Sequence, residues 1–262
     1  MEVYICENTL EGVFSAIFSA YADRHPHSDN KIITGSVKNY ELFANYIPVT
    51  TNKEHALRVS RRLYNTLGSE VFYDLCAALL CETSFATEVA DAVYHTIVLG
   101  LSLARQGKDG RRILEHLTNP YVNLVFRCAR QTKHEARQFY GFLRFRELSN
   151  GVLLARFHPN NNIITMLIEH FDNRLPKEAY IIYDANRDIA ALHEPYHPSI
   201  LLTHPEFEQE ALLRYSEQEQ EYEALWQQFY ESITIESRIN PALRQSNIPK
   251  RFWKDTIELY TQ

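Results

Sequence analysis

The feature that most constrains this chain is a change in the spacing of its apolar residues near residue 142. Before that point, apolar side chains recur every three to four positions, the period of an amphipathic helix. In 142–148 and 152–157, apolar and polar residues alternate instead, as in a strand with one buried face. Ser149-Asn150-Gly151 joins the two runs, and Asn-Gly is a strong signal for a hairpin turn. The sequence therefore predicts a β-hairpin after a mostly helical N-terminal half.

A second pair of short strands is predicted at 180–183 and 189–192. Helical spacing over 161–171 places a helix between the two pairs. The centre of the chain is thus expected to form a small antiparallel β-β-α-β-β unit.

Elements with weaker or longer signals flank this unit. We expect short strands at 3–6 and near 32–37, and a helix over 119–140 that begins at an Asn-Pro cap and ends before a glycine. A long helix is predicted over about 206–232, with Trp226, Phe229 and Tyr230 in the core, and a terminal helix near 249–260.

Composition supports one folded α+β protein. The 262 residues are 45% hydrophobic and 23% charged, which is typical of globular chains. We expect a helical region over 1–118 and an α+β region over 119–262, packed as one compact unit. No apolar run reaches the ~18 residues of a membrane span, the N-terminus lacks the basic start of a signal peptide, and four cysteines make no disulfide framework. A cytoplasmic location without a membrane partner is therefore expected.

The formal net charge of −6 argues against a simple cationic nucleic-acid binder, but the charges are segregated along the chain. Residues 103–157 hold eleven Lys or Arg against four Asp or Glu, a balance of +7. Residues 205–236 hold nine Glu against one Arg, a balance of −8, and five further basic residues follow in 238–254. Such segregation produces a local positive field on an anionic protein.

The hairpin concentrates part of this positive charge. Strand alternation places Arg144, Arg146 and Arg156 on the face opposite the apolar one. Either neighbouring acids neutralise these arginines, or the arginines receive phosphates, which suit the guanidinium fork. Aromatic residues interleaved with cations near the C-terminus resemble a surface for stacking single-stranded nucleic acid, although the favoured interpretation of Trp253 is an anchor of the terminal helix. The candidate nucleic-acid-binding residues are Arg127, Arg130, Arg137, Arg144, Arg146, Arg156, Lys250, Arg251, Trp253 and Lys254.

Catalytic signals are weaker. Glu135, His170 and Asp184 are candidate acid or base residues. The chain has no HExxH or Cys-x2-Cys pattern, no phosphate-binding glycine loop and no three-cysteine cluster motif, so no metal or cofactor is predicted. His197-Pro198-Ser199 is interpreted as part of a loop.

Several motifs, in order, resemble the prokaryotic "probable DNA metabolism protein" family. They include Glu135 before Gly-Phe-Leu-Arg-Phe, then Pro-Asn-Asn-Asn, His-Phe, Tyr-Ile-Ile-Tyr-Asp and Asn-Pro. The matching residues are Glu135, Gly141, Phe142, Arg144, Phe145, His170, Arg174, Asp184, Arg187, Asn240 and Pro241. Members of this family are linked to an uncharacterised radical-SAM protein, and some are fused to a uracil-DNA-glycosylase-like domain. The resemblance implies a context of DNA repair or modification and no particular reaction.

The leading hypothesis is an accessory protein that binds single- or double-stranded DNA and works with a radical-SAM enzyme. The alternative is a glycosylase- or nuclease-like enzyme that acts on DNA or a nucleotide, with an arginine-lined phosphate pocket. A third hypothesis is an interaction module whose Glu-rich helix, 206–223, docks on a basic surface of a partner.

Overall fold

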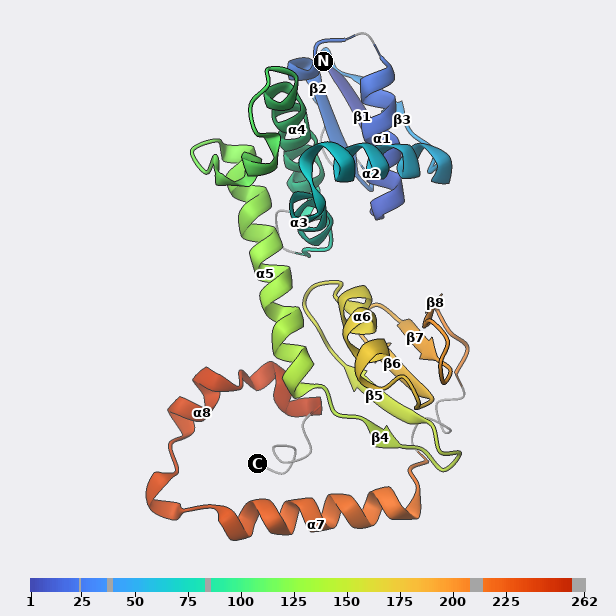
Figure 1. Cartoon of the computed structure of the whole chain (residues 1–262), viewed down its shortest axis with the longest axis vertical. Helices are drawn as coiled ribbons and strands as arrows, with labels where there is room; N and C mark the ends of the chain where they lie inside the picture. The colour runs from blue at the N-terminus through green and yellow to red at the C-terminus, as the bar shows by residue number, and fades with distance from the viewer. Residues whose placement is uncertain (24, 37–39, 83–85, 208–213, 256–262) are drawn as a thin grey trace. The chain divides into compact units, whose positions relative to one another are not determined.

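A computed structural model describes residues 1–23, 25–36, 40–82, 86–207 and 214–255, without the side chains of residues 86, 87, 251, 254 and 255. It confirms the α+β class. Internal contacts divide the chain into unit 1, Met1–His134, and unit 2, Glu135–Gln262. The boundary between the two units falls inside helix α5, Pro120–Phe142, so residues of this one helix belong to both units (Figure 1).

Unit 1 contains a three-stranded parallel sheet in the order β2-β1-β3. The predicted strands at 3–6 and near 32–37 are present, and a third strand, which the sequence analysis missed, lies on the other side of β1. Both faces of β1 are covered, because Val3 and Tyr4 point to opposite faces and both are 0% exposed. The strands are β1 (Glu2–Cys6), β2 (Asn30–Thr34) and β3 (Asn45–Pro48).

The rest of unit 1 is helical. Helix α1 forms because it has a buried apolar stripe and a capped N-terminus. Its apolar stripe is buried, with Val13, Phe14 and Ile17 at most 3% exposed. Thr9 caps its N-terminus by accepting a hydrogen bond from the Gly12 backbone N–H at 3.0 Å. The helical segments of unit 1 before α5 are α1 (Leu10–Ala22), η1 (His27–Asp29), α2 (Lys53–Leu67), α3 (Ser69–Leu79), α4 (Ala86–Arg105) and η2 (Gly110–Glu115).

Helix α5 confirms one predicted boundary and corrects the other. Its Asn119–Pro120 start is confirmed, since Asn119 Oδ1 accepts from the Tyr121 backbone N–H at 2.9 Å. The helix does not stop at Gly141 and ends only at Phe142. A helical glycine costs only ~1 kcal/mol. Phe139 and Leu143 on either side are both buried in the core of unit 2, so packing outweighs the glycine.

The sheet of unit 2 has the order β4-β5-β6-β7-β8. The hairpin at Asn150-Gly151 is confirmed, and Gly151 adopts a positive φ of 80°. The unit is not purely antiparallel, because β5 and β6 pair in parallel across helix α6, while β8 is an additional edge strand. These elements are β4 (Arg146–Glu147), β5 (Leu153–Phe157), α6 (Ile164–Arg174), β6 (Tyr180–Asp184), β7 (Ile189–His193) and β8 (Ile200–Thr203).

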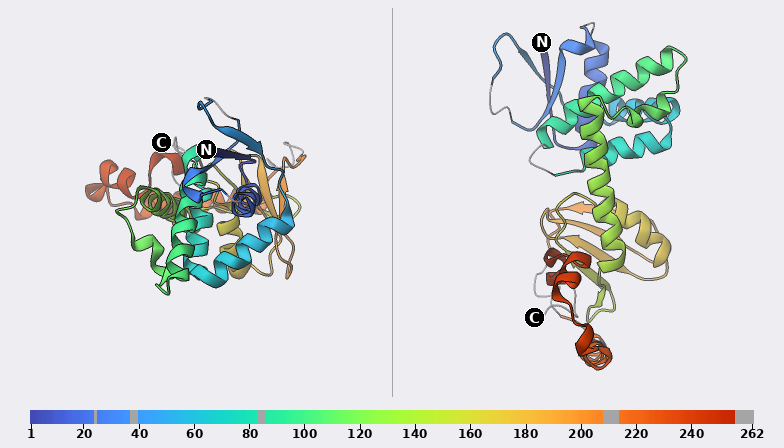
Figure 2. Two further views of the ribbon diagram at one scale, coloured as in Figure 1. Left: turned by 90° about the horizontal axis from the view of Figure 1, so that it is seen from above. Right: turned by 90° about the vertical axis from the view of Figure 1, so that its left-hand side faces the viewer.

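The core of unit 2 lies on one face of this sheet, where α6 packs against β6 and β7 (Figures 1 and 2). Ala155 and Phe157 of β5, both 0% exposed, point to this face, as the sequence predicts. Phe252 from the C-terminal segment is also buried there, with its ring centre 4.7 Å from that of Phe139.

The C-terminal segment differs most from expectation. The long helix begins at Glu217, not near 206, and residues 208–213 lie outside the described part of the chain. None of its residues is buried, so the assignment of Trp226, Phe229 and Tyr230 to the core is wrong. The predicted terminal helix is a short 3-10 segment as far as the structure describes it. The segment comprises α7 (Glu217–Ile233), η4 (Glu236–Arg238), α8 (Pro241–Asn247) and η5 (Lys250–Asp255).

Candidate nucleic-acid interface

Glu135, on α5, holds the backbone of the 159–162 segment. Its Oε1 accepts a hydrogen bond from the Asn160 backbone N–H at 3.0 Å. Its Oε2 accepts from the backbone N–H and side-chain Nδ2 of Asn161, at 2.8 and 2.6 Å. Glu135 is 2% exposed and Asn161 is 1% exposed. The carboxylate is therefore engaged inside the unit, away from solvent.

Asp184, at the end of β6, reaches the same segment through Arg187. The Arg187 guanidinium bonds Asp184 Oδ2 at 2.9 Å and the carbonyl oxygens of Pro159 and Asn160 at 3.2 and 2.6 Å. Asp184 is 0% exposed, and burial raises the pKa of its carboxyl group despite the opposing effect of Arg187. Glu135, the 159–162 segment, Asp184 and Arg187, all residues of the sequence motifs, thus form one network.

His170, the third candidate acid or base, stacks on a tyrosine. His170, on α6, stacks on Tyr140 of α5 with ring centres 4.2 Å apart. The neighbouring Phe171 is buried in the core, and Arg174 is exposed at the last residue of the helix. His170 is half-buried and packs between helices in the manner of an aromatic side chain.

The arginines predicted to share one sheet face are only partly brought together. Arg146 pairs across the hairpin with Leu154, so it lies on the same face as Arg156. Arg144 is not in the strand, because β4 starts two residues later, and its Nη1 donates to the Gly141 carbonyl oxygen at 2.8 Å. The predicted strand over 142–148 is correspondingly too long.

Glu223 of α7 neutralises one of these arginines. Arg146 Nη2 lies 2.5 Å from Glu223 Oε1, and its guanidinium stacks 3.5 Å from the centre of the Tyr215 ring. Arg156 is exposed on β5. On α5, Arg127 and Arg130 are exposed in unit 1 and Arg137 is exposed in unit 2.

The C-terminal aromatic residue is both anchored and flanked by cations. Trp253 is half-buried, and its indole N–H donates to the Ile248 carbonyl oxygen at 2.8 Å. Arg244 lies 5.1 Å and Lys250 lies 6.0 Å from the ring centre. The side chains of Arg251 and Lys254, which were predicted to contribute, lie outside the described part of the structure.

Sequence reasoning missed a second polar cluster in unit 2. Asp172 accepts hydrogen bonds from the Tyr180 hydroxyl and, at 2.5 Å, from Ser199 Oγ, and His193 Nδ1 lies 3.2 Å away. Burial raises the pKa of Asp172, but the hydrogen bonds from Ser199 and Tyr180 outweigh it and lower the pKa. Ser199 follows the His-Pro pair, which was the only signal in the sequence. Because Ser199 donates directly to the carboxylate, the cluster fixes a loop and does not form a catalytic triad.

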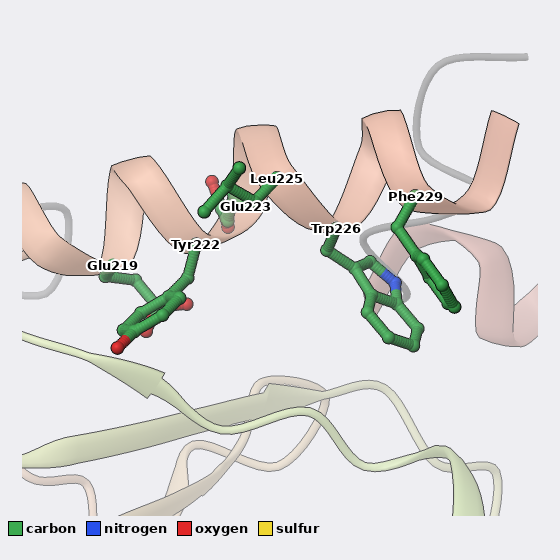
Figure 3. Close-up of a pocket in the computed structure, with 6 residues that line it drawn as sticks. All are labelled: Glu219, Tyr222, Glu223, Leu225, Trp226 and Phe229. Carbon is green, nitrogen blue, oxygen red and sulfur yellow. The ribbon is translucent and has the colours of Figure 1, made fainter. Parts of the chain in front are cut away.

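The exposed face of α7 carries a stripe of apolar side chains. Tyr222, Leu225, Trp226 and Phe229 are 46–59% exposed. They line, together with Glu219 and Glu223, an open cavity of about 500 Å³. Figure 3 shows Tyr222, Trp226 and Phe229 projecting from one side of the helix, with the last two rings side by side, at 5.7 Å between centres.

A second concave surface follows α7 and holds the motif residues nearest the C-terminus. It encloses about 890 Å³ between the end of α7 and α8. Asn240 and Pro241 lie at its α8 end, where Asn240 Oδ1 caps α8 by accepting from the Leu243 backbone N–H at 3.0 Å. Arg238 and Arg244 also line it, together with Glu231 and Glu236, so the surface is apolar with charges of both signs.

Two properties concern the described residues as a whole. Their histidines, cysteines and acidic residues do not gather in any group of three suited to a metal ion. Their helices are all too short or too polar to cross a membrane.

Comparison with protein families identifies a match that covers more than half of the chain. The model of DUF4130, a domain family of unknown function, matches residues 87–258. This range contains every motif residue described above. No curated protein and no solved structure matches the chain.

Proposed function

The chain belongs to the DUF4130 family, and on that premise we propose that it is an accessory DNA-binding protein in DNA repair or modification, working beside a radical-SAM enzyme. The observation that carries the proposal is Trp253, a half-buried ring with Arg244 and Lys250 close to it. Single-stranded nucleic acid binds to such sites by stacking a base on the ring while cations neutralise the backbone.

Exposed arginines of unit 2 supply the phosphate contacts in this proposal. Arg137 on α5 and Arg156 on β5 are exposed, whereas Arg146 is already paired with Glu223. Phosphate contacts carry no sequence information. The expected binding is therefore salt-dependent and weakly selective for sequence.

Tryptophan fluorescence tests the Trp253 contact directly. The chain has two tryptophans, so a Trp226→Phe variant reports on Trp253 alone. We expect quenching by single-stranded oligothymidylate, and weaker quenching at higher salt. Lys250→Ala should weaken binding, whereas Lys177→Ala, at an exposed lysine that follows α6, should not. Absence of quenching, or quenching independent of salt, contradicts the proposal.

A second surface, the exposed stripe of α7, favours the partner component of the proposal. The helix carries Glu217, Glu219, Glu221, Glu223 and Glu231 and no basic residue. An exposed apolar stripe beside acidic side chains suits a partner surface that is apolar at its centre and basic at its edge. The radical-SAM protein is the proposed occupant.

Co-purification with the radical-SAM protein tests this contact. Phe229→Glu should abolish co-purification, because it places a charge in the stripe. The matched control is Tyr73→Glu, which adds the same charge at an aromatic residue of unit 1 that is 57% exposed. Retention of the complex by Phe229→Glu, or equal loss in both variants, rules out α7 as the docking surface.

A further inference from the structure

A pocket in unit 1 lies among α1, α2 and α4, and none of its residues belongs to the candidate nucleic-acid interface. It has a volume of about 260 Å³. Ile17, Leu63 and Ile97, one from each helix, line it and are at most 1% exposed. Its interior is thus apolar, as in most small-molecule sites.

Three arginines also line this apolar pocket. Arg58 and Arg62 are four residues apart on α2, and Arg105 is the last residue of α4. All three are exposed, and no carboxylate among the described residues forms an ion pair with any of them. Like charges four apart on a helix repel one another. A helix C-terminus favours Arg105, and Glu54 lies four residues before Arg58, so Arg62 has the least compensation of the three.

The positive charge of one of these arginines, Arg105, affects a neighbouring histidine. The pKa of His27 is lowered, first by burial and then by the positive charge of Arg105. Tyr21, which lines the pocket, has a buried hydroxyl with no hydrogen-bond partner among the described residues. The pocket thus combines an apolar interior, net positive charge and an unused polar atom.

We propose that this pocket binds a phosphate monoester carried on a small aromatic or nucleoside body. Guanidinium groups suit phosphate oxygens because they donate two hydrogen bonds in one plane. A phosphate monoester brings a charge of about −1.5 to −2 at neutral pH, which offsets most of the charge of three arginines. The volume lies just below the ~300 Å³ at the lower end of ligand pockets, so one ring system fits better than a dinucleotide.

This inference is independent of the proposed DNA binding. Its residues belong to unit 1, whereas Trp253 and its neighbouring cations belong to unit 2. Seven of the ten lining residues precede residue 87, where the DUF4130 match begins. The pocket is therefore mainly a property of the part of this chain outside the family match.

Calorimetric titration of the intact chain tests the proposal with four probes. Thymidine 5′-monophosphate and phenyl phosphate should bind, and the stronger of the two identifies the body that the pocket prefers. Thymidine and inorganic phosphate should each bind at least about tenfold more weakly, because each lacks one of the two contacts. Equal binding of inorganic phosphate, or no binding of either phosphate monoester, overturns the proposal.

A matched pair of variants assigns the binding to this pocket. Arg62→Glu reverses a charge that lines the pocket, and Arg61→Glu reverses the adjacent exposed charge that does not. We expect about a tenfold or greater loss for Arg62→Glu and an unchanged affinity for Arg61→Glu, with circular dichroism confirming that both are folded. Equal losses in the two variants place the phosphate elsewhere. Oligothymidylate quenching of Trp253 should be unaffected by Arg62→Glu, so this proposal and the DNA-binding proposal fail separately.

Discussion

The apolar stripe of α1 is buried, whereas the stripe of α7 is exposed to solvent. Phe14 of α1 is 3% exposed, and Phe229 of α7 is 51% exposed. Both helices have the same apolar spacing, and a Thr or Ser side chain caps each. The difference lies in what surrounds them, because β1, β2 and α2 contact α1, and no residue of α7 is buried. An amphipathic helix contributes to folding stability only where its stripe is covered, so α1 is expected to stabilise the fold and α7 to bind a partner.

The largest expected difference between the two helices comes from truncating one phenylalanine in each. Phe14→Ala should lower the free energy of unfolding by about 3–5 kcal/mol, because it leaves a cavity in a closed core. Phe229→Ala should change it by less than about 0.5 kcal/mol, because the residue lies on the surface and leaves no closed cavity. Urea denaturation of both variants measures the difference, and similar losses would show that α7 is covered in solution.

A smaller loss is expected where unit 2 does depend on buried polar groups. Asp172→Asn removes the charge that accepts from Tyr180 and Ser199 and should cost about 2 kcal/mol. This loss of unfolding free energy should exceed that of any single truncation on the exposed face of α7. A smaller cost than that of Phe229→Ala would reverse the ranking of the two regions.

The effect of Asp172→Asn should also depend on pH. The pKa of Asp172 is lowered in the folded state, so its charge stabilises the protein above the unfolded-state pKa of about 3.9. This stability is lost as the pH falls below that value. The gap in unfolding free energy between wild type and the variant, which does not titrate, should narrow as the pH falls from about 3.9 towards the lower folded-state pKa. A constant gap would show that the carboxylate charge is not responsible.

Removing the cap of each helix should change the stability of the protein by smaller amounts. Thr9→Ala in α1 should cost about 1 kcal/mol of global stability. Ser216 caps α7 through the Glu219 backbone N–H at 3.0 Å, so Ser216→Ala should lower helix content by circular dichroism without shifting the unfolding midpoint. An equal midpoint shift for both variants would indicate that α7 unfolds together with the core.

The smallest expected effect concerns the ion pair that joins α7 to β4. Arg146 and Glu223 are 30% and 22% exposed, and pairs that solvent reaches contribute at most about 1 kcal/mol. A double-mutant cycle of Arg146→Ala and Glu223→Ala isolates this coupling. A coupling well above that value would show that α7 is held firmly and would weaken the contrast with α1.

Local signals predicted the elements they directly encode. The Asn150-Gly151 turn, the Asn119–Pro120 cap and the stripe of α1 each act within a few residues, and all are confirmed. The stripe of α7 predicted a helix but not its exposure, because periodicity does not reveal what covers a face. The parallel β5–β6 pairing and the strand β3 depend on distant segments, for which the sequence has no short-range signal. The edge strand β8 pairs with its chain neighbour β7, and the sequence analysis missed it.

The candidate site was predictable to a similar extent. Alternation correctly placed Arg146 and Arg156 on one face, but the packing of Phe142 and Leu143 extended α5 and removed Arg144 from the strand. The sequence also could not predict that other motif residues form hydrogen bonds with Glu135. Its partners lie 25 and 26 residues away, and their hydrogen bonds exist only in the folded unit.

The parallel pairing of β5 with β6 has a kinetic consequence. The β4–β5, β6–β7 and β7–β8 pairings join strands that are neighbours in the chain, whereas β5 and β6 meet only after α6 is in place between them. Closing that crossover requires the chain to lose entropy before the pairing is gained. The rate at which unit 2 folds should therefore be limited by the docking of α6, and substitutions at Leu167 should slow refolding more than they speed unfolding.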